Sequence, residues 1–469
     1  MKKYLLLFTA LFVFTQYSIP QNKIDGSYKG AIVIAGRNID IGVTFKTEGE
    51  SLEGTFEQQG VTLPLSDIKY NYPSISFILK IQTSDASFDG IVYSDSISGA
   101  FKQSSFIGRF YLKPFKEVPK DTTSIKESLP YKEEEVTFKN GENTFAGTLT
   151  LPPNEGKHPA VIMITGSGPQ DRNEEILGFK IFGIIADFFT RKGIAVLRYD
   201  DRNVGKSKGT DIGNSTTEDF AGDVIEAVNY LKTRNDINHA QIGLFGHSEG
   251  GIVAPIAASK NKEIAFIVLM AGTSVKGADI ILKQSELIMR SNGESEFNIK
   301  NSLEASKKIL DAVMNNADMD ATKKELEKKY IEDYDSLSQD MKNSITDKQT
   351  YAKDRVESTI SAYNSTWMKY FLSYDPKNAL EKVSCPVLAL FGELDLQVPP
   401  SQNEQPMRDA LSKSDSKDFT IKIFPKANHL FQTATNGSPN EYGKLPKEFV
   451  DGFLEYISGW ILNRVTIIK

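Results

Sequence analysis

The feature that most constrains the fold of this chain is the pentapeptide Gly246-His247-Ser248-Glu249-Gly250, together with its flanks. It follows the short apolar run 241–245 and precedes the small-residue run 251–258, an order that predicts a strand, a sharp turn and a helix. At such a turn the central residue is held in a strained backbone conformation, and Cβ atoms two residues to either side would collide. Ser248, between two glycines, is therefore a candidate nucleophile.

The same spacing of glycine, serine and glycine occurs again at residues 205–209. With each residue type near about 7% of positions, chance produces the pattern in roughly one chain of this length in six. Ser207 lies several residues beyond the nearest apolar run, and the polar stretch 210–215 that follows it has no helical period. We interpret Ser207 as a loop residue, because only Ser248 has the strand and the helix beside it.

The length and composition point to a soluble protein of more than one domain. At 469 residues the chain exceeds the length of about 150 residues that one domain usually has. Its formal charge of −6 does not favour nucleic acid as a partner. Cys385 is the single cysteine, which excludes an intrachain disulfide, and its place before an apolar run favours a buried, inert thiol.

The N-terminus has the pattern of a signal peptide. Two lysines precede an apolar core, residues 4–14, that is too short to span a bilayer. We predict a signal peptide over 1–22, removed between residues 18 and 23, with export to the periplasm or the medium and no stable membrane insertion afterwards. A membrane anchor that is never cleaved is the alternative, whereas a lipid anchor is disfavoured because no cysteine lies near this segment.

Residues 24–114 are rich in short β-branched and aromatic runs broken by glycine, with turn signals about every 8 to 12 residues. This pattern predicts a small all-β domain, a meander or partial barrel. Carbohydrate or protein binding is one interpretation of its role, and a structural domain beside a catalytic one is the other. Residues 115–132 mix prolines, charges, threonine and serine without apolar period, and are predicted to be a linker.

The pattern of residues 133–469 predicts a mostly parallel sheet with helices on both faces, because fully apolar runs alternate with amphipathic stretches. The apolar runs are 161–164, 194–197, 242–245, 265–269, 387–391 and 421–424, and the amphipathic stretches include 181–191 and 218–233. From about 275 to 375 the sequence is charged and helical, which predicts a cap over the strand ends where ligands bind. Its more apolar part, 367–372, either lines a pocket or packs against the sheet.

A serine hydroxyl needs a base within hydrogen-bond reach and an acid that orients the base. Three of the four histidines are poorly placed: one precedes a strand, one lies in the turn before the serine's strand, and one is fixed beside the serine. They are His158, His239 and His247. His429 follows the last predicted strand, where a loop can bring it over the sheet, so we predict that it is the base.

The acid is expected at the end of a strand between the serine and the histidine in sequence. Asp395 fits, because it follows the run 387–391 directly. Glu393 is the close rival, but it lies too near the strand end, and a solvated loop charge is the alternative interpretation of either carboxylate.

The developing oxyanion needs backbone N–H donors. We predict one from Glu249 and the other from the glycine-rich loop 165–169, with Ser167 as first choice and Gly168 as second. The side chain of Glu249, at the start of a helix, is favoured by the helix dipole without a catalytic role.

Five motifs in order resemble the α/β-hydrolase superfamily, and most of all the EstD-type bacterial carboxylesterases, from about Glu133 to the C-terminus. They are residues 166–172, 198–202, 246–251, 392–395 and 428–429. The resemblance implies an α/β fold with an eight-stranded, mostly parallel sheet, a helical cap, and hydrolysis of short acyl or acetyl esters by the triad Ser248, Asp395 and His429. It implies no cofactor and no metal, and an extra N-terminal β domain is similar to that of exported relatives. One departure is Asn203, where related sequences more often have glycine.

Two other functions remain open. A serine peptidase of the prolyl-oligopeptidase type would share the core and the triad order, but such enzymes usually carry a large propeller and an aromatic residue after the serine, where this chain has Glu249. A non-catalytic binding protein on a hydrolase scaffold would be expected to lack a triad member, and each member has a candidate here.

Overall fold

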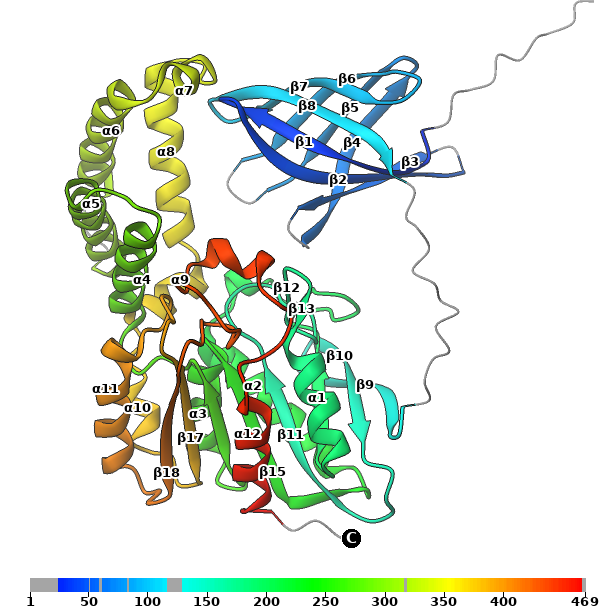
Figure 1. The fold of residues 1–469 in the computed structure, drawn as a ribbon, viewed down its shortest axis with the longest axis vertical. Helices are drawn as coiled ribbons and strands as arrows, with labels where there is room; N and C mark the ends of the chain where they lie inside the picture. The colour runs from blue at the N-terminus through cyan, green and yellow to red at the C-terminus, as the bar shows by residue number, and fades with distance from the viewer. Residues whose placement is uncertain are drawn as a thin grey trace, which may run out of the picture. The chain divides into compact units, whose positions relative to one another are not determined.

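The computed structural model describes residues 24–49, 51–58, 61–81, 84–115, 129–315 and 319–465. The chain divides into two compact units, one within Met1–Val118 and the other within Pro119–Lys469 (Figure 1). The predicted signal peptide, 1–22, and most of the predicted linker, 115–132, lie outside the described residues. In the part that is described, no helix is long and apolar enough to cross a membrane.

The first unit is a closed antiparallel barrel of eight strands, counted over its described residues. The strands are β1 (Gly26–Ile34), β2 (Arg37–Glu48), β3 (Ser51–Gln58), β4 (Val61–Asn71), β5 (Ser74–Leu79), β6 (Ala86–Val92), β7 (Ile97–Gln103) and β8 (Phe106–Phe115). The sequence predicted a meander or partial barrel. The barrel closes because β8 pairs with β1, from Ser27 opposite Phe115 to Val33 opposite Arg109.

Phenylalanine rings occupy the interior of the barrel, because alternate residues of each strand point inward. The rings of Phe77 and Phe88 stack with their centroids 4.7 Å apart, and Phe110 meets both edge-on. Burial of these large side chains is the main source of stability for a unit of this size. The barrel therefore has an aromatic core of its own.

The second unit is built on an eight-stranded sheet in the order β18-β17-β16-β15-β11-β14-β10-β9, within its described residues. Its strands are β9 (Lys132–Asn140), β10 (Asn143–Leu151), β11 (His158–Ile164), β14 (Ala195–Tyr199), β15 (Ile237–His247), β16 (Ile267–Met270), β17 (Val387–Gly392) and β18 (Phe419–Phe424). The β9–β10 and β10–β14 pairs are antiparallel and the others are parallel. This confirms the predicted fold class. A two-stranded hairpin, β12 (Glu175–Ile176) and β13 (Phe179–Lys180), precedes the first helix.

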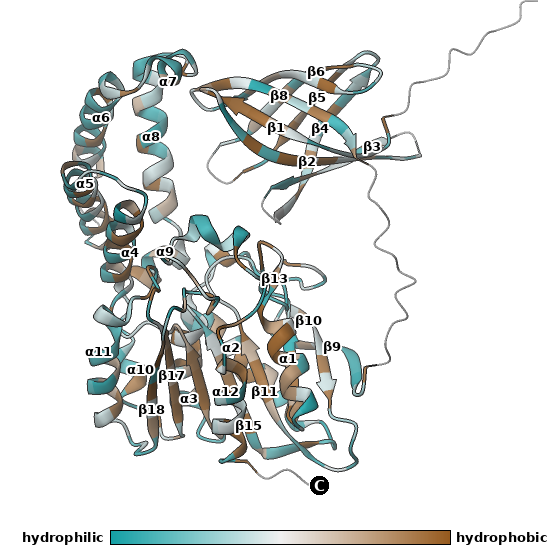
Figure 2. Ribbon diagram, in the orientation of Figure 1, coloured by the Kyte–Doolittle hydropathy of each residue, from teal (hydrophilic) through white to brown (hydrophobic). Residues whose placement is uncertain are grey.

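Helices cover both faces of this sheet, so its central strands are buried on two sides (Figures 1 and 2). These helices are α1 (Ile181–Arg191), α2 (Thr217–Lys232), α3 (Gly250–Lys260), α11 (Pro400–Lys413) and α12 (Phe453–Leu462), with short 3₁₀ turns at Ile212–Asn214 and Pro439–Lys444. Neighbouring residues of β11 face opposite sides: Val161 packs with residues of α1 and α12, and Ile162 with residues of α2 and α3. Burial on both faces explains why the central strands are almost wholly apolar.

A helical cap is inserted between β16 and β17, as predicted. It comprises α4 (Gly277–Ser291), α5 (Glu296–Met314), α6 (Met319–Ser336), α7 (Gln339–Asn343), α8 (Lys348–Tyr363) and α9 (Thr366–Ser373), and α10 (Lys377–Leu380) leads back to the sheet. The cap has a small core in which Ile309, Leu310 and Leu372 are buried. Its other faces are charged, in agreement with the sequence pattern.

Candidate active site

Ser248 lies on the sharp turn between β15 and α3, with a backbone φ of 53°. Its N–H donates to the carbonyl oxygen of Met270 at 2.9 Å, which ties the turn to the end of β16. A Cβ at Gly246 would lie 2.0 Å from the carbonyl oxygen of Gly250, and one at Gly250 would lie 2.2 Å from that of Ile164. Both glycines are therefore required for the close packing that presents the serine side chain at the carboxyl end of the strand.

Ser207, in the second copy of the motif, has a different environment. It is fully buried, its Oγ donates to the carbonyl oxygen of Asp200 at 2.8 Å, and it accepts from the N–H of Ala146 at 2.9 Å. Its hydroxyl joins the loop after β14 to β10, which is a structural role.

His429 and Asp395 are in contact. Nδ1 of His429 lies 2.9 Å from Oδ2 of Asp395, and both side chains are buried. Oδ1 of Asp395 accepts from the N–H groups of Gln397 and Val398 at 2.8 and 2.9 Å, which fixes the carboxylate. The rival, Glu393, is exposed and accepts from the backbone N–H of Lys426 instead.

Ser248 and His429 line the same cleft, which holds about 1070 Å³ of empty space. Among the described side chains, no hydrogen bond joins Ser248 Oγ to the ring of His429. Such bonds are often long without substrate and shorten in the reacting complex. Ser248 and His429 therefore line one cleft, and the ring of His429 contacts the carboxylate of Asp395.

Two histidines that the sequence analysis rejected as the base, and the single cysteine, have local structural environments. Nε2 of His158 lies 3.0 Å from the carbonyl oxygen of Asn154, and Nε2 of His239 lies 2.9 Å from that of Arg234. Cys385 is buried, and burial raises the pKa of its thiol to about 12, which keeps it protonated.

The sequence analysis did not single out Glu174, a buried residue that joins three segments of the site. Its Oε1 lies 2.8 Å from Nδ1 of His247 and accepts from the N–H of Gly166 at 2.7 Å, while Nε2 of His247 faces the carbonyl oxygen of His429. Burial lowers the pKa of His247, but the charge and hydrogen bond of Glu174, the contact with the His429 carbonyl and the charge of Asp395 together outweigh it, so the pKa is raised overall. Glu174 lies in an irregular loop with φ 46°, where no periodic pattern could indicate it.

The two predicted oxyanion donors face the same cleft. Within the residues that the structure describes, the backbone N–H groups of Glu249 and Ser167 have no protein acceptor, and both residues line the cleft beside Ser248. Gly168, the second choice, has a φ of 90° that suits glycine. Two free N–H groups next to a serine can bind an oxygen that gains negative charge.

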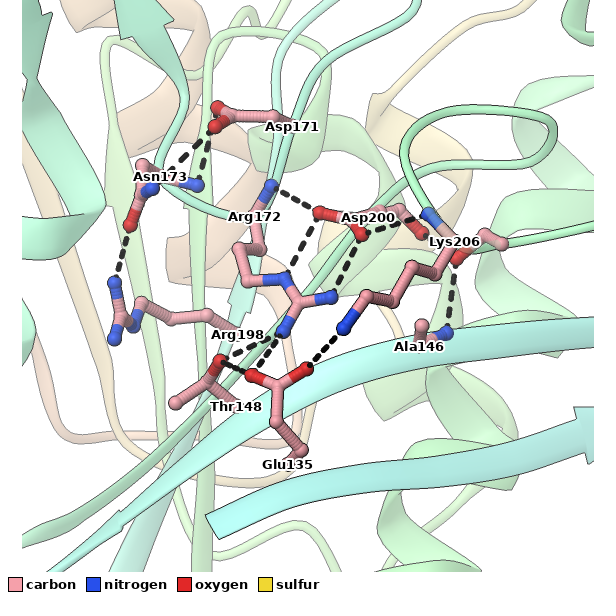
Figure 3. A network of polar contacts seen from close by, with 10 residues as sticks. Glu135, Ala146, Thr148, Asp171, Arg172, Asn173, Arg198, Asp200 and Lys206 are labelled. Atoms are coloured by element: carbon pink, nitrogen blue, oxygen red, sulfur yellow. Dashed lines mark hydrogen bonds and ion pairs between the residues drawn. The ribbon is translucent and has the colours of Figure 1, made fainter. Parts of the chain in front are cut away.

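A polar network holds the loop that carries Ser167 (Figure 3). Arg172 binds Asp200 through two parallel hydrogen bonds of 2.9 and 2.7 Å, and its third nitrogen donates to Glu135 and Thr148. The contact brings together two of the motifs quoted above, residues 166–172 and 198–202. Planar, two-pronged pairing of this kind fixes geometry as well as charge.

Two further contacts complete this support. Asp201 accepts from the hydroxyl of Thr165 and the N–H of Gln170, at 2.8 and 2.9 Å, which holds both ends of the oxyanion loop. Asn203, the departure from related sequences, has a φ of 59°. Asparagine tolerates this left-handed conformation better than most residues, so it replaces glycine here at low cost.

The side chain of Glu249 does more than the sequence predicted. It is buried, accepts from Thr217 Oγ1 at 2.7 Å, and accepts from Nε1 of Trp367 at 2.9 and 3.1 Å. Burial raises the pKa of this carboxyl. Trp367 belongs to α9, so the apolar segment 367–372 of the cap lines the cleft, one of the two interpretations that its sequence allowed.

The arrangement fits attack on a carbonyl group. A serine on a strained turn, a histidine held by a buried carboxylate, and free N–H groups meet at one cleft, and these are the parts that acyl transfer requires.

Comparison with known proteins agrees with the fold and the motifs. Residues 179–433, a range that contains Ser248, Asp395 and His429, match the family described as serine aminopeptidase, S33. Esterase EstD of Thermotoga maritima is 26% identical over 357 residues, which cover 73% of this chain and 72% of EstD. A mitochondrial acyl-coenzyme A thioesterase 2 of mouse is 31% identical over 149 residues, 31% of this chain and 29% of the relative.

Among solved structures, this chain is similar to the α/β hydrolase GrgF from Penicillium. The superposition covers 72% of this chain and 98% of the GrgF chain, with 22% sequence identity and a TM-score of 0.41. By the family match over more than half of its residues, together with the sheet, the elbow and the cap described above, this chain belongs to the serine aminopeptidase S33 family and is an α/β hydrolase.

Proposed function

We propose that this hydrolase cleaves carboxylic esters of short acyl groups, acetyl esters among them, through an acyl-enzyme on Ser248. The observation that carries the proposal is the placement of Ser248, at a positive φ on a cleft that it shares with His429, whose ring contacts the buried Asp395. A small-molecule ester is the substrate class, and the chemistry needs no cofactor.

In the proposed mechanism, Nε2 of His429 takes the proton of the Ser248 hydroxyl as Oγ attacks the ester carbonyl. The N–H groups of Glu249 and Ser167 stabilise the oxyanion of the tetrahedral intermediate. The imidazolium then protonates the departing alcohol, which leaves the acyl group on Ser248. His429 next takes a proton from water as the water oxygen attacks the acyl carbonyl. The imidazolium then returns the proton to Ser248 Oγ as the bond between Oγ and the acyl carbon breaks, and the carboxylic acid leaves. Asp395 orients the ring and stabilises its charged form.

The relatives favour an ester over other acyl compounds. EstD is named an esterase and is matched over most of its length, whereas the mouse thioesterase is matched over less than a third. Both names describe transfer of an acyl group to water, which is the reaction proposed here.

The test is a panel of esters that varies acyl length and includes sugar acetates and feruloyl esters, with Ser248→Ala as the inactive variant. We expect a loss of about 10⁶ in turnover for Ser248→Ala. Ser207→Ala is the matched control, because it removes the serine of the second motif. A fluorophosphonate should label Ser248 and leave Ser207 unmodified in a peptide mass map. Normal turnover by Ser248→Ala would refute the proposal.

The same assays decide between the other candidate functions. The family description names an aminopeptidase, and the sequence left open a prolyl-oligopeptidase activity, so proline-containing peptides and aminoacyl amides belong in the panel. A kcat/KM for these substrates above that for every ester would favour a peptidase. A binding protein without catalysis would neither turn over esters nor react with the fluorophosphonate.

Export is also a proposal. The sequence of residues 1–22 supports it, and the test is fractionation of cells that express the full chain or a chain without these residues. We expect the full chain outside the cytoplasm, with a mature N-terminus between residues 18 and 23. Retention of the full chain in the cytoplasm would contradict export.

A further inference from the structure

A hydrogen bond joins the cap to a buried carboxylate beside Ser248, that of Glu249. Glu249 is 4% exposed, and its carboxylate accepts from Thr217 and Trp367, which lie far apart in the sequence. Thr217 is the first residue of α2, and Trp367 lies in α9, 118 residues after Glu249. The indole N–H lies within hydrogen-bond distance of both carboxylate oxygens, at 2.9 and 3.1 Å.

These bonds bear on catalysis because of the position of Glu249. Its backbone N–H, directly after Ser248, is one of the two proposed oxyanion donors. A buried carboxylate that loses a donor is costly, so it shifts toward another partner or toward water. Glu249 carries both this carboxylate and the proposed oxyanion N–H, so a bond that fixes the carboxylate also limits the movement of that residue. The hydrogen bond from Trp367 therefore restrains a group that acts on the reacting oxygen.

Trp367 is also part of the wall of the cleft. It lines the cleft together with Met368 and Phe371 of the same helix. The rings of Trp367 and Phe371 stack with centroids 5.8 Å apart and an interplanar angle of 20°. One face of the cap thus presents an apolar, aromatic wall whose first ring is fixed by the hydrogen bond to Glu249.

We propose that Trp367 is a positioning residue through which the cap holds the oxyanion N–H of Glu249 in place, while its ring forms the wall against which an apolar group of the ester packs. The inference rests on the proposed ester hydrolysis at Ser248. The indole N–H acts through Glu249, and the indole ring acts on the substrate by contact.

The role of the indole N–H can be separated from that of the ring by Trp367→Phe, which removes the N–H and keeps an aromatic ring. An interaction that matters only in the transition state affects kcat and leaves KM nearly unchanged. Loss of an oxyanion donor itself costs about 10²–10³ in kcat, so displacement of one should cost less, about tenfold. The expected result with p-nitrophenyl acetate and butyrate is a kcat about tenfold lower and a KM within about twofold of the wild type.

The matched control is Trp460→Phe. Trp460 is the other of the two tryptophans, lies in α12, and its Nε1 donates to Thr420 on β18 at 3.3 Å. We expect this variant to keep kcat and KM. In the Trp460→Phe protein, Trp367 is the single tryptophan, so emission excited at wavelengths that tyrosine does not absorb reports on the cleft. Modification of Ser248 by a fluorophosphonate should shift or quench that emission.

The outcomes are distinct. An unchanged kcat in Trp367→Phe, or a rise in KM alone, overturns the inference. An emission of Trp367 that does not respond to modification of Ser248 also overturns it, and this measurement needs no substitution at Trp367. If Ser248→Ala is inactive while Trp367→Phe keeps its kcat, only this inference fails. If Ser248→Ala stays active, the proposed function fails and this inference fails with it.

Discussion

Nε2 of His247 lies 3.1 Å from the backbone carbonyl oxygen of His429, so the residue before Ser248 supports the loop that carries His429. A carbonyl oxygen only accepts, and therefore Nε2 carries a proton. Nδ1 faces Glu174 Oε1, which already accepts from the N–H of Gly166. One buried contact network thus joins the turn of Ser248, the loop of His429 and the loop 165–169.

The first prediction concerns the pH dependence of this network. Because the folded protein raises the pKa of His247, its ion pair with Glu174 contributes stability in full below the ordinary value near 6.5. That contribution is lost as pH rises through the raised value. His247→Gln combined with Glu174→Gln replaces both charges together. We expect the difference in melting temperature between the wild type and this variant to shrink from pH 6 to pH 10.

Thermal melts across this pH range provide the measurement, and His239→Gln is the control. The ring of His239 bonds a carbonyl oxygen near the other end of β15. If the difference in melting temperature between the wild type and the double variant stays constant with pH, His247 and Glu174 do not form a charged pair.

The second prediction separates the two candidate acids. Asp395→Asn should lower kcat by about 10⁴, because the ring of His429 loses the carboxylate that orients it and stabilises its charged form. Glu393→Gln should leave kcat within about twofold, since Glu393 is exposed and contacts a backbone N–H. Steady-state kinetics on one ester suffices for both. A large loss in Glu393→Gln with activity retained in Asp395→Asn would reverse the assignment.

The third prediction follows from the packing around the elbow. Gly250→Ala places a Cβ 2.2 Å from the carbonyl oxygen of Ile164, and this contact between backbone groups cannot relax by a side-chain rotation. We expect a loss of at least about 3 kcal/mol in unfolding free energy, or no folded protein. Gly459→Ala, in α12, has open space around its Cβ and should be stabilising by about 0.5–1 kcal/mol. Urea unfolding of the two variants gives the comparison.

The fourth prediction tests the support of the oxyanion loop. Arg172→Ala should cost about 3 kcal/mol in unfolding free energy, because it leaves the largely buried Asp200 without its partner. Activity should fall as well, since Ser167 lies on the loop that Arg172 holds. The control is Arg191→Ala, which breaks an exposed ion pair with Asp187 and should cost less than about 1 kcal/mol. Similar losses in both variants would mean that the Arg172 network has no special role.

The local parts of the site were predictable from sequence because they depend on neighbours in the chain. The elbow around Ser248 needs glycines two residues away, and central strands such as β17 are apolar because helices cover both faces. The edge strand β9 and its neighbour β10 were not among the predicted runs. Half of β9 is exposed, so polar and apolar residues alternate and no continuous apolar run marks the strand.

The contact between His429 and Asp395 was predicted from motifs, but other contacts between distant segments were not. Closure of the barrel depends on the pairing of its first and last strands, and the bond from Trp367 to Glu249 spans 118 residues. Glu174 is a polar residue in an irregular loop, and only the folded chain shows that it is buried against His247. A single sequence carries no periodic signal for contacts of this kind.

The cap begins and ends at neighbouring strands of the sheet, and this has a consequence for how such proteins diversify. β16 and β17 pair from Ile267 opposite Val387 to Met270 opposite Leu390, as if nothing had been inserted between them. The entropy of closing a loop grows only slowly with its length, by about 0.6 kcal/mol for each doubling. An insertion attached in this way can be lengthened, shortened or exchanged while the strands, the elbow and the base keep their places. Substrate specificity can therefore evolve, or be engineered, by exchange of the cap while the sheet and its loops stay unchanged.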